Sequence, residues 1–170
     1  MEHPAENEYP AFYQKYVSLI PNGNILQMME KQNEQFCEFL ATVSEDKANY
    51  SYEKGKWSVK EVIGHLIDVE LAFLYRAWRF SRNDKAKLHG FEQDDFIANS
   101  DFSKLTLSEL VEQFYHMRKA AIPMFSSFTD EMWSRKGTAN GGSFTVKSIA
   151  YIMVGHVIHH MKMIHSKYLN

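Results

Sequence analysis

The sequence has one cysteine, Cys37, and only four prolines among its 170 residues. A single cysteine excludes an internal disulfide framework and any metal site built from several cysteines. Cys37 lies between Phe36 and Phe39 in a helical pattern, so we interpret it as a small buried apolar side chain rather than a nucleophile. Stability must therefore come from a hydrophobic core, and a chain of this length can bury about 70% of its unfolded surface.

The chain also lacks a charge excess and a long apolar run. Nineteen Lys and Arg nearly balance 21 Asp and Glu, a formal net charge of -2, so no positive field is available to attract nucleic acid or anionic lipid. No apolar run approaches the ~20 residues that span a bilayer, and the first ten residues are acidic and polar. We expect a single cytoplasmic domain over residues 1–170, with neither nucleic acid nor membrane as a partner.

Apolar residues recur at helical spacing in four segments, and no segment has the sustained alternation of a half-buried strand. The pattern predicts helices over about residues 24–43, 59–82 and 107–128, and a fourth helix that is capped by Ser143 or Thr145 and runs to about residue 168. Ser58 with Glu61 and Thr106 with Glu109 match capping boxes at two of the starts. Pro123 predicts a kink in the third helix. The fold class is therefore all-α, and a four-helix bundle is its simplest architecture.

The predicted connection between the second and third helices is long. Residues 83–104 lack helical periodicity, and a loop of that length in a compact domain is often functional. Asp94 and Asp95 could cover a site as base or substrate contact, although a solvated acidic loop explains them equally well. Before the fourth helix we expect a single-turn helix near 130–133 and a turn cluster over 137–142.

The histidines carry the strongest chemical signal. His156 and His160 lie on the apolar stripe of the fourth helix, about one turn apart, a spacing from which two imidazoles can hold one transition metal. His65 lies between Val62 and Val69 and faces inward on the second helix. Three imidazoles buried without partners would be costly, and one divalent cation would satisfy all three. Core histidines that are merely hydrogen-bonded are the alternative.

Other polar residues are weaker candidates. Asp68 follows His65 by one turn and could orient its ring, although a surface aspartate is the simpler interpretation. His159 lies on the flank of the histidine stripe, at the rim or in a supporting position. The remaining histidines receive no site role: His3, His89, His116 and His165.

Several basic and aromatic residues could bind the carboxylate of an anionic substrate, because a guanidinium fork matches a carboxylate. Surface ion pairs explain them equally well. These candidates are Tyr75, Arg76, Arg79 and Arg118.

A set of short motifs, in this order and spacing, resembles the DinB superfamily. The resemblance extends over nearly the whole chain and points to the bacterial branch that is described as metal-dependent hydrolases and includes bacillithiol-type thiol transferases. Its elements are Glu8-Tyr9-Pro10 with Tyr13 and Tyr16, Lys56-Trp57-Ser58, residues 64–70 with Tyr75-Arg76, residues 90–95, Arg118, residues 135–141, and residues 155–160.

The resemblance implies an up-down-down-up bundle with a metal ion, zinc or nickel, bound by His65, His156 and His160. It also implies a small-molecule substrate and often a homodimer. In the thiol-transferase members a low-molecular-weight thiol is activated at the metal and attacks an electrophile. We therefore expect a thiol S-transferase acting in detoxification or a hydrolase, with Asp68 and Asp95 as further catalytic candidates. A stress protein that binds metal or ligand without turnover is the alternative.

Overall fold

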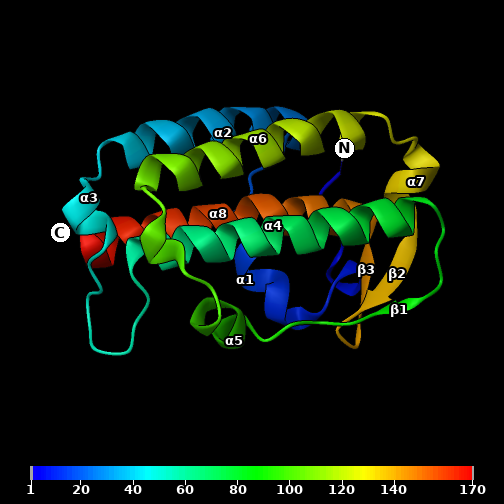
Figure 1. The fold of residues 1–170 in the computed structure, drawn as a ribbon. Helices are drawn as coiled ribbons and strands as arrows, with labels where there is room; N and C mark the ends of the chain where they lie inside the picture. The colour runs from blue at the N-terminus through cyan, green and yellow to red at the C-terminus, as the bar shows by residue number, and fades with distance from the viewer. Residues whose placement is uncertain (1, 170) are drawn as a thin grey trace.

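The computed structural model describes residues 2–169 and confirms a four-helix bundle. Figure 1 shows four long helices side by side: α2 (Ile25–Ala41), α4 (Val59–Ser81), α6 (Leu107–Ser126) and α8 (Val146–Tyr168). Around the bundle, α2 and α4 both contact α6 and α8. Helices α4 and α6 run in the same direction, opposite to α2 and α8, which is the up-down-down-up order. Within the described residues no helix combines the length and hydropathy of a membrane span.

The shorter elements lie between and beside the long helices. The N-terminal segment contains two 3-10 turns, η1 (Glu6–Glu8) and η2 (Ala11–Tyr13), and a one-turn helix, α1 (Gln14–Val17), which packs on α8. The other short elements are α3 (Glu45–Ala48), β1 (Lys87–Leu88), α5 (Gln93–Ala98), η3 (Phe102–Lys104), α7 (Asp130–Ser134), β2 (Lys136–Ala139) and β3 (Gly142–Thr145).

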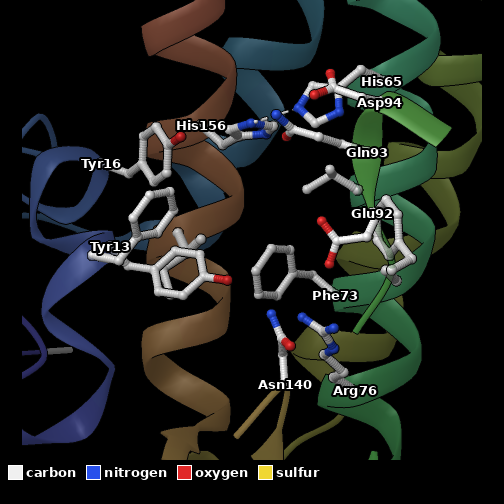
Figure 2. A pocket seen from close by; sticks show the side chains of 15 residues that line it. Tyr13, Tyr16, His65, Phe73, Arg76, Glu92, Gln93, Asp94, Asn140 and His156 are labelled. Carbon is white, nitrogen blue, oxygen red and sulfur yellow. Dashed lines mark hydrogen bonds between the residues drawn. The ribbon is translucent and has the colours of Figure 1, made fainter. Parts of the chain in front are cut away.

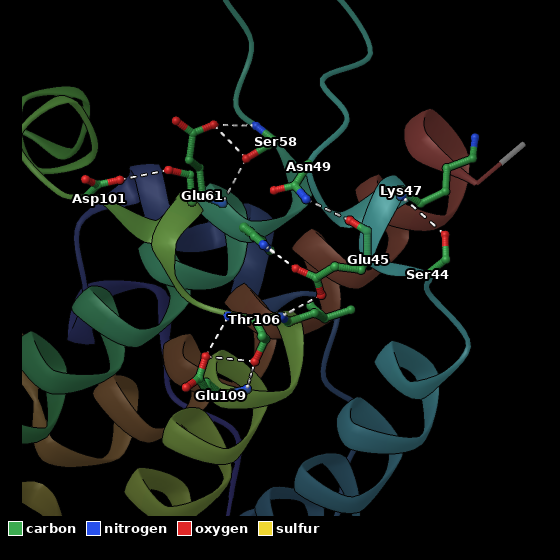
Figure 3. A network of polar contacts seen from close by, with 12 residues as sticks. Ser44, Glu45, Lys47, Asn49, Ser58, Glu61, Asp101, Thr106 and Glu109 are labelled. Atoms are coloured by element: carbon green, nitrogen blue, oxygen red, sulfur yellow. Dashed lines mark hydrogen bonds and ion pairs between the residues drawn. The ribbon is translucent and has the colours of Figure 1, made fainter.

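Side-chain caps fix where the helices begin. Ser58 accepts from the Glu61 amide while the Glu61 carboxylate accepts from the Ser58 amide, and Thr106 pairs with Glu109 in the same way (Figure 3). These two capping boxes confirm the predicted starts of α4 and α6. Helix α6 continues through Pro123 to Ser126.

Buried charge ties three of these helix starts together. The Glu45 carboxylate accepts from the Leu107 amide at 3.0 Å and pairs with the buried Lys60 ammonium (Figure 3). Glu45 begins α3, Lys60 lies in the first turn of α4, and Leu107 begins α6. The pKa of Glu45 is lowered, mainly by its hydrogen bond with Lys60. The ends of α3, α4 and α6 are therefore held at one corner of the bundle.

The predicted turn cluster over 137–142 is a hairpin, which corrects the sequence interpretation. Strands β2 and β3 pair antiparallel, and only Asn140 and Gly141 form the turn, with φ of 48° and 73°. Positive φ at both positions is what a two-residue type I′ turn requires, and Asn-Gly adopts it readily. Strand β1, within the predicted loop, pairs parallel with β2. This small sheet joins the α4–α6 connection to the bundle.

The core consists of two hydrophobic clusters along the bundle axis. One cluster includes Phe73 and Phe80 of α4 and the first turns of α8, and the other includes Ile63 and Leu66 of α4 and the last turns of α8. Most of the buried polar side chains lie near the boundary between the clusters. They are Gln32 and Asn33 of α2, His65 and Glu70 of α4, Arg118 of α6, and His156 and His160 of α8.

Gly155 sets how closely the N-terminal segment approaches this boundary. A Cβ at this helical position would lie 2.2 Å from the backbone oxygen of Tyr16. In an open helix, Gly→Ala stabilises by about 1 kcal/mol. We expect Gly155→Ala to lower the free energy of unfolding instead, by about 1–3 kcal/mol, because α1 must move away from α8. Urea unfolding measures the change.

Gly64→Ala is the matched control in α4. A Cβ there would meet the ring of Phe102, which is half-buried and can shift, rather than backbone. We expect a smaller loss of stability for Gly64→Ala than for Gly155→Ala. Equal or greater stability of Gly155→Ala than of the wild type would contradict the close α1–α8 contact.

Candidate metal centre

Three histidines from two helices meet at the boundary between the hydrophobic clusters. His65 of α4 and His156 of α8 bring their Nε2 atoms to 3.2 Å, and the Nε2 of His160 lies 3.0 Å from that of His156. The possible ligand atoms of all three lie within 4.8 Å of one another. Each residue is less than 8% exposed. The structure therefore brings together the three histidines that helical phase selected in the sequence.

The spacing of the three rings is compatible with one shared metal ion as well as with hydrogen bonds between them. A neutral imidazole Nε2 either carries one hydrogen or offers one lone pair, so His156 cannot serve two neighbours equally well. Two nitrogens that each lie about 2.1 Å from one tetrahedral ion are roughly 3.4 Å apart. The observed 3.0 and 3.2 Å are close to that spacing. The donor set of three imidazoles also suits zinc or nickel.

Burial keeps the three imidazoles neutral at pH 7, as metal ligands must be. Desolvation lowers the pKa of His65 to about 4, with the charge of Asp94 opposing the shift. The pKa of His160 falls to about 3, again mainly by burial and then by its histidine neighbours and Lys15. The pKa of His156 lies well below 6.5 for the same first cause. The Nδ1 of His160 is buried without a hydrogen-bond partner among the described residues.

Aromatic rings hold two of these histidines in place. The Trp57 ring lies 5.0 Å from that of His65, between ring centroids, and Tyr16 contacts His156 edge-on at 5.1 Å. His159 is half-buried and lies between Tyr16 and His160, at 5.4 and 5.1 Å. His159 therefore occupies the flanking position that its helical phase predicted.

A cavity of about 340 Å³ opens beside the histidines. His65 and His156 line one end of it, and the α4–α6 connection supplies Glu92, Gln93 and Asp94 (Figure 2). Phe91 comes from the same connection, and the rest of the wall comes from the N-terminal segment, α4, the hairpin turn and α8, as Phe12, Tyr13, Tyr16, Val69, Ala72, Phe73, Arg76, Asn140 and Ile152. An ion held by the histidines would thus face a space large enough for a small organic molecule.

The two acidic catalytic candidates lie elsewhere. Asp68 is half-buried on α4 and forms no hydrogen bond with a histidine among the described residues, and burial raises its pKa. Asp95 is exposed and does not line the cavity, whereas its neighbour Asp94 does. Of the acidic residues singled out in the sequence, Asp94 is the one at the site.

Arg118 does not contact the cavity. It is fully buried, and its Nε and Nη2 donate to the two carboxylate oxygens of Glu70 at 2.5 and 2.8 Å. Its Nη1 donates to Gln32 at 3.0 Å, and the Gln32 amide donates to the carbonyl of Val154. This network crosses all four long helices and gives Arg118 a structural role that neither sequence interpretation anticipated. Cys37, expected to be buried, is half-buried and also lies outside the cavity.

Several residues of the cavity wall were not expected at a site from the sequence pattern itself. Phe12 was not singled out, and Tyr13, Tyr16, Gln93 and Asn140 entered only within motifs of the family resemblance. Helix α1 has four residues, too few for periodicity to reveal which side faces inward. The Asn-Gly pair indicated a turn at Asn140 but not a place in a cavity wall.

This combination of fold and site defines a class: helical bundles with a buried triad of inward-facing histidines beside a cavity. The sequence profile of the DinB superfamily matches residues 28–164, and the chain belongs to this superfamily. No curated protein matches the chain at a significant level.

Solved structures with the same fold include YfiT from Bacillus subtilis, described as a probable metal-dependent hydrolase with an unusual four-helix bundle topology. YfiT matches with a TM-score of 0.75 and 15% sequence identity, over 85% of this chain and 89% of YfiT. The mycothiol-dependent maleylpyruvate isomerase matches with a TM-score of 0.69 and 15% identity, over 85% of this chain but 61% of the isomerase chain. A histidine-to-alanine mutant of that isomerase gives a TM-score of 0.68.

The depressed histidine pKa values predict how the metal-free protein responds to acid. Unfolded imidazoles take up protons near pH 6.5, whereas native His65 does so only near pH 4, so the unfolded state binds more protons between these values. The free energy of unfolding should therefore fall as pH falls from about 6.5 to about 4. At about 1.4 kcal/mol per pKa unit, His65 alone accounts for about 3 kcal/mol.

Urea unfolding of the metal-free protein across this pH range measures the slope. His65→Asn should flatten it, while replacement of the exposed His116 should leave it unchanged. Identical slopes for the wild type and His65→Asn would show that His65 titrates normally in the folded state.

Proposed function

We propose that His65, His156 and His160 bind one divalent metal ion and that the chain is a metal-dependent enzyme acting on a small molecule. The observation that carries the proposal is the convergence of three neutral, buried imidazoles, two of which, His65 and His156, line the end of a cavity. Three protein ligands leave a coordination position for substrate, which is the pattern of catalytic rather than closed structural sites. Zinc and nickel, the ions that the family resemblance implies, are among the metals that imidazole ligands suit.

A divalent ion held by His65, His156 and His160 would lower the pKa of a bound water or thiol and so supply a nucleophile near neutral pH. The protein's own residues supply the rest. Trp57 and Tyr16 fix the His65 and His156 rings by contact. Asp94 lines the cavity near His65 and can accept the proton that the nucleophile loses. Phe12, Phe73 and Phe91 line the cavity with apolar surface that limits water around the reacting groups.

The reaction that we favour is transfer of a low-molecular-weight thiol to an electrophilic carbon. The thiol comes from a cosubstrate, because Cys37 lies outside the cavity and burial raises its pKa. The thiol dependence in the name of the similar isomerase supports this choice. Hydrolysis is the second candidate, supported by the description of YfiT and by the acidic residue at the histidine end of the cavity.

The first prediction of this proposal concerns metal content. Purified protein should retain about one divalent ion per chain after gel filtration, because three ligands from two packed helices are held in place before the metal binds. His156→Ala and His160→Ala should each lose most of the ion, as measured by elemental analysis. His165→Ala, at an exposed position of the same helix, should keep it. Equal metal content in all four proteins would contradict the site.

The second prediction concerns turnover. The metal-loaded protein should conjugate at least one member of a panel of small thiols to an electrophilic dye, and a chelator should abolish the reaction. His65→Ala should lose more than the roughly 10- to 100-fold that follows replacement of a residue that only orients a metal ligand. The dye's absorbance reports the rate, and a parallel ester and amide panel tests hydrolysis. Full activity in metal-free His65→Ala would contradict the mechanism.

A further inference from the structure

The cavity beside the histidines has a second polar end. Arg76 follows His65 by eleven residues on α4, so the two side chains lie about 20° apart around the helix and roughly 16 Å apart along it. Figure 2 shows His65 and His156 at one end of the cavity, and the Arg76 guanidinium, the Asn140 amide and the Tyr13 hydroxyl at the other. Apolar side chains, including Val69 and Phe73, line the wall between the ends.

Arg76 is a buried cation whose charge the protein leaves uncompensated. It is 6% exposed, and no ion pair joins it to a carboxylate within residues 2–169. Its Nη2 donates to the carbonyl of His89 at 3.3 Å, and its guanidinium carbon lies 5.1 Å from the centre of the Phe73 ring. A guanidinium has five N–H donors, and these neighbours provide no negative charge. Burial lowers the pKa of Arg76, with Tyr13 opposing the shift.

The other buried arginine provides the comparison. Arg118 is also removed from water, but both carboxylate oxygens of Glu70 accept from it. A buried charge is costly unless it is paired, so the protein neutralises Arg118 within its own core. Arg76 differs because its missing partner would have to come from the cavity that it lines.

We propose that Arg76, together with the Tyr13 hydroxyl and the Asn140 amide, binds a carboxylate of the substrate at the end of the cavity opposite the histidines. The ligand class is a small elongated molecule with a carboxylate at one end and the reacting group at the other. The flat guanidinium matches a carboxylate with two parallel hydrogen bonds. Asp94 lies beside His65 at the histidine end and disfavours a second negative charge there, while Glu92 lines the cavity between its two ends (Figure 2). The inference builds on the proposed function, which gives the cavity its role as substrate site.

A test compares ω-mercapto carboxylic acids of increasing chain length with the amides of the same thiols. Dissociation constants are measured by calorimetry on the metal-loaded protein. The best acid should bind the wild type at least about tenfold more tightly than its amide, a factor that corresponds to one charge-assisted hydrogen-bonded pair. Arg76→Gln should lose this preference and still bind the amide. If the wild type binds the acids and their amides equally tightly, the proposal is overturned whatever the variants show.

Arg79→Gln is the matched control, because Arg79 lies less than one turn away on α4, pairs with Asp84 and does not line the cavity. It should keep the full preference for acids. Arg76→Lys retains the charge but cannot form two parallel hydrogen bonds, so its preference should fall several-fold. Full preference in folded Arg76→Gln or in Arg76→Lys would overturn the assignment.

The same comparison on metal-free protein, with alkyl carboxylic acids and amides that carry no thiol, separates this inference from the proposed function. An Arg76-dependent preference for acids there supports the carboxylate site even where the chain retains no metal. Metal retention and thiol turnover without any preference for acids would support the proposed function and overturn the carboxylate site.

Discussion

The burial of three neighbouring imidazole rings away from water is the main constraint that the packing of the helices must satisfy. His65, His156 and His160 are buried between two hydrophobic clusters, where a protonated ring would lose its hydration, a cost that the charge of Asp94 offsets only in part at His65. The rings therefore stay neutral, with the Nε2 atom of His156 3.2 Å from that of His65 and 3.0 Å from that of His160. Packing of the two clusters supplies the stability that offsets the cost of burying these rings.

The network around Arg118 keeps the helices that carry the histidines in register. Glu70 lies on α4 five residues after His65, and Val154 lies on α8 two residues before His156. Arg118 contacts Glu70 directly and Val154 through Gln32, so one buried network joins the two histidine-bearing helices. A shift of either helix along its axis would break charge-assisted hydrogen bonds in a region without water. The position of the nitrogens therefore depends on a network that never contacts the cavity.

Sequence reasoning found the features that depend on local periodicity and missed those that depend on distant partners. The phase of α4 and α8 placed His65 and His156 on inward faces, and the capping boxes at Ser58 and Thr106 gave correct helix starts. Strands of two to four residues are too short to show alternation, so β1, β2 and β3 remained hidden in a predicted loop and turn.

Arg76 and Arg118 are a second example of features that depend on distant partners and could not be predicted from the sequence. Arg76 and Arg118 are equivalent from sequence, since each follows an inward stripe and could pair at the surface or bind an anion. Their surroundings differ because Glu70 forms an ion pair with Arg118, whereas no carboxylate among residues 2–169 forms one with Arg76. A partner 48 residues away in the chain cannot be identified from helical phase. The division between structural and ligand-binding arginine is thus a property of the tertiary packing.

The long helices and the shorter segments make different contributions to the site. The long helices hold the three nitrogens, whereas much of the cavity wall comes from the N-terminal segment, the α4–α6 connection and the β2–β3 turn. Short irregular segments can change their side chains without disturbing helix packing. The match at 15% identity shows a common bundle, and the side chains that line the cavity, such as Tyr13, Glu92 and Asn140, are ones that the bundle itself does not dictate.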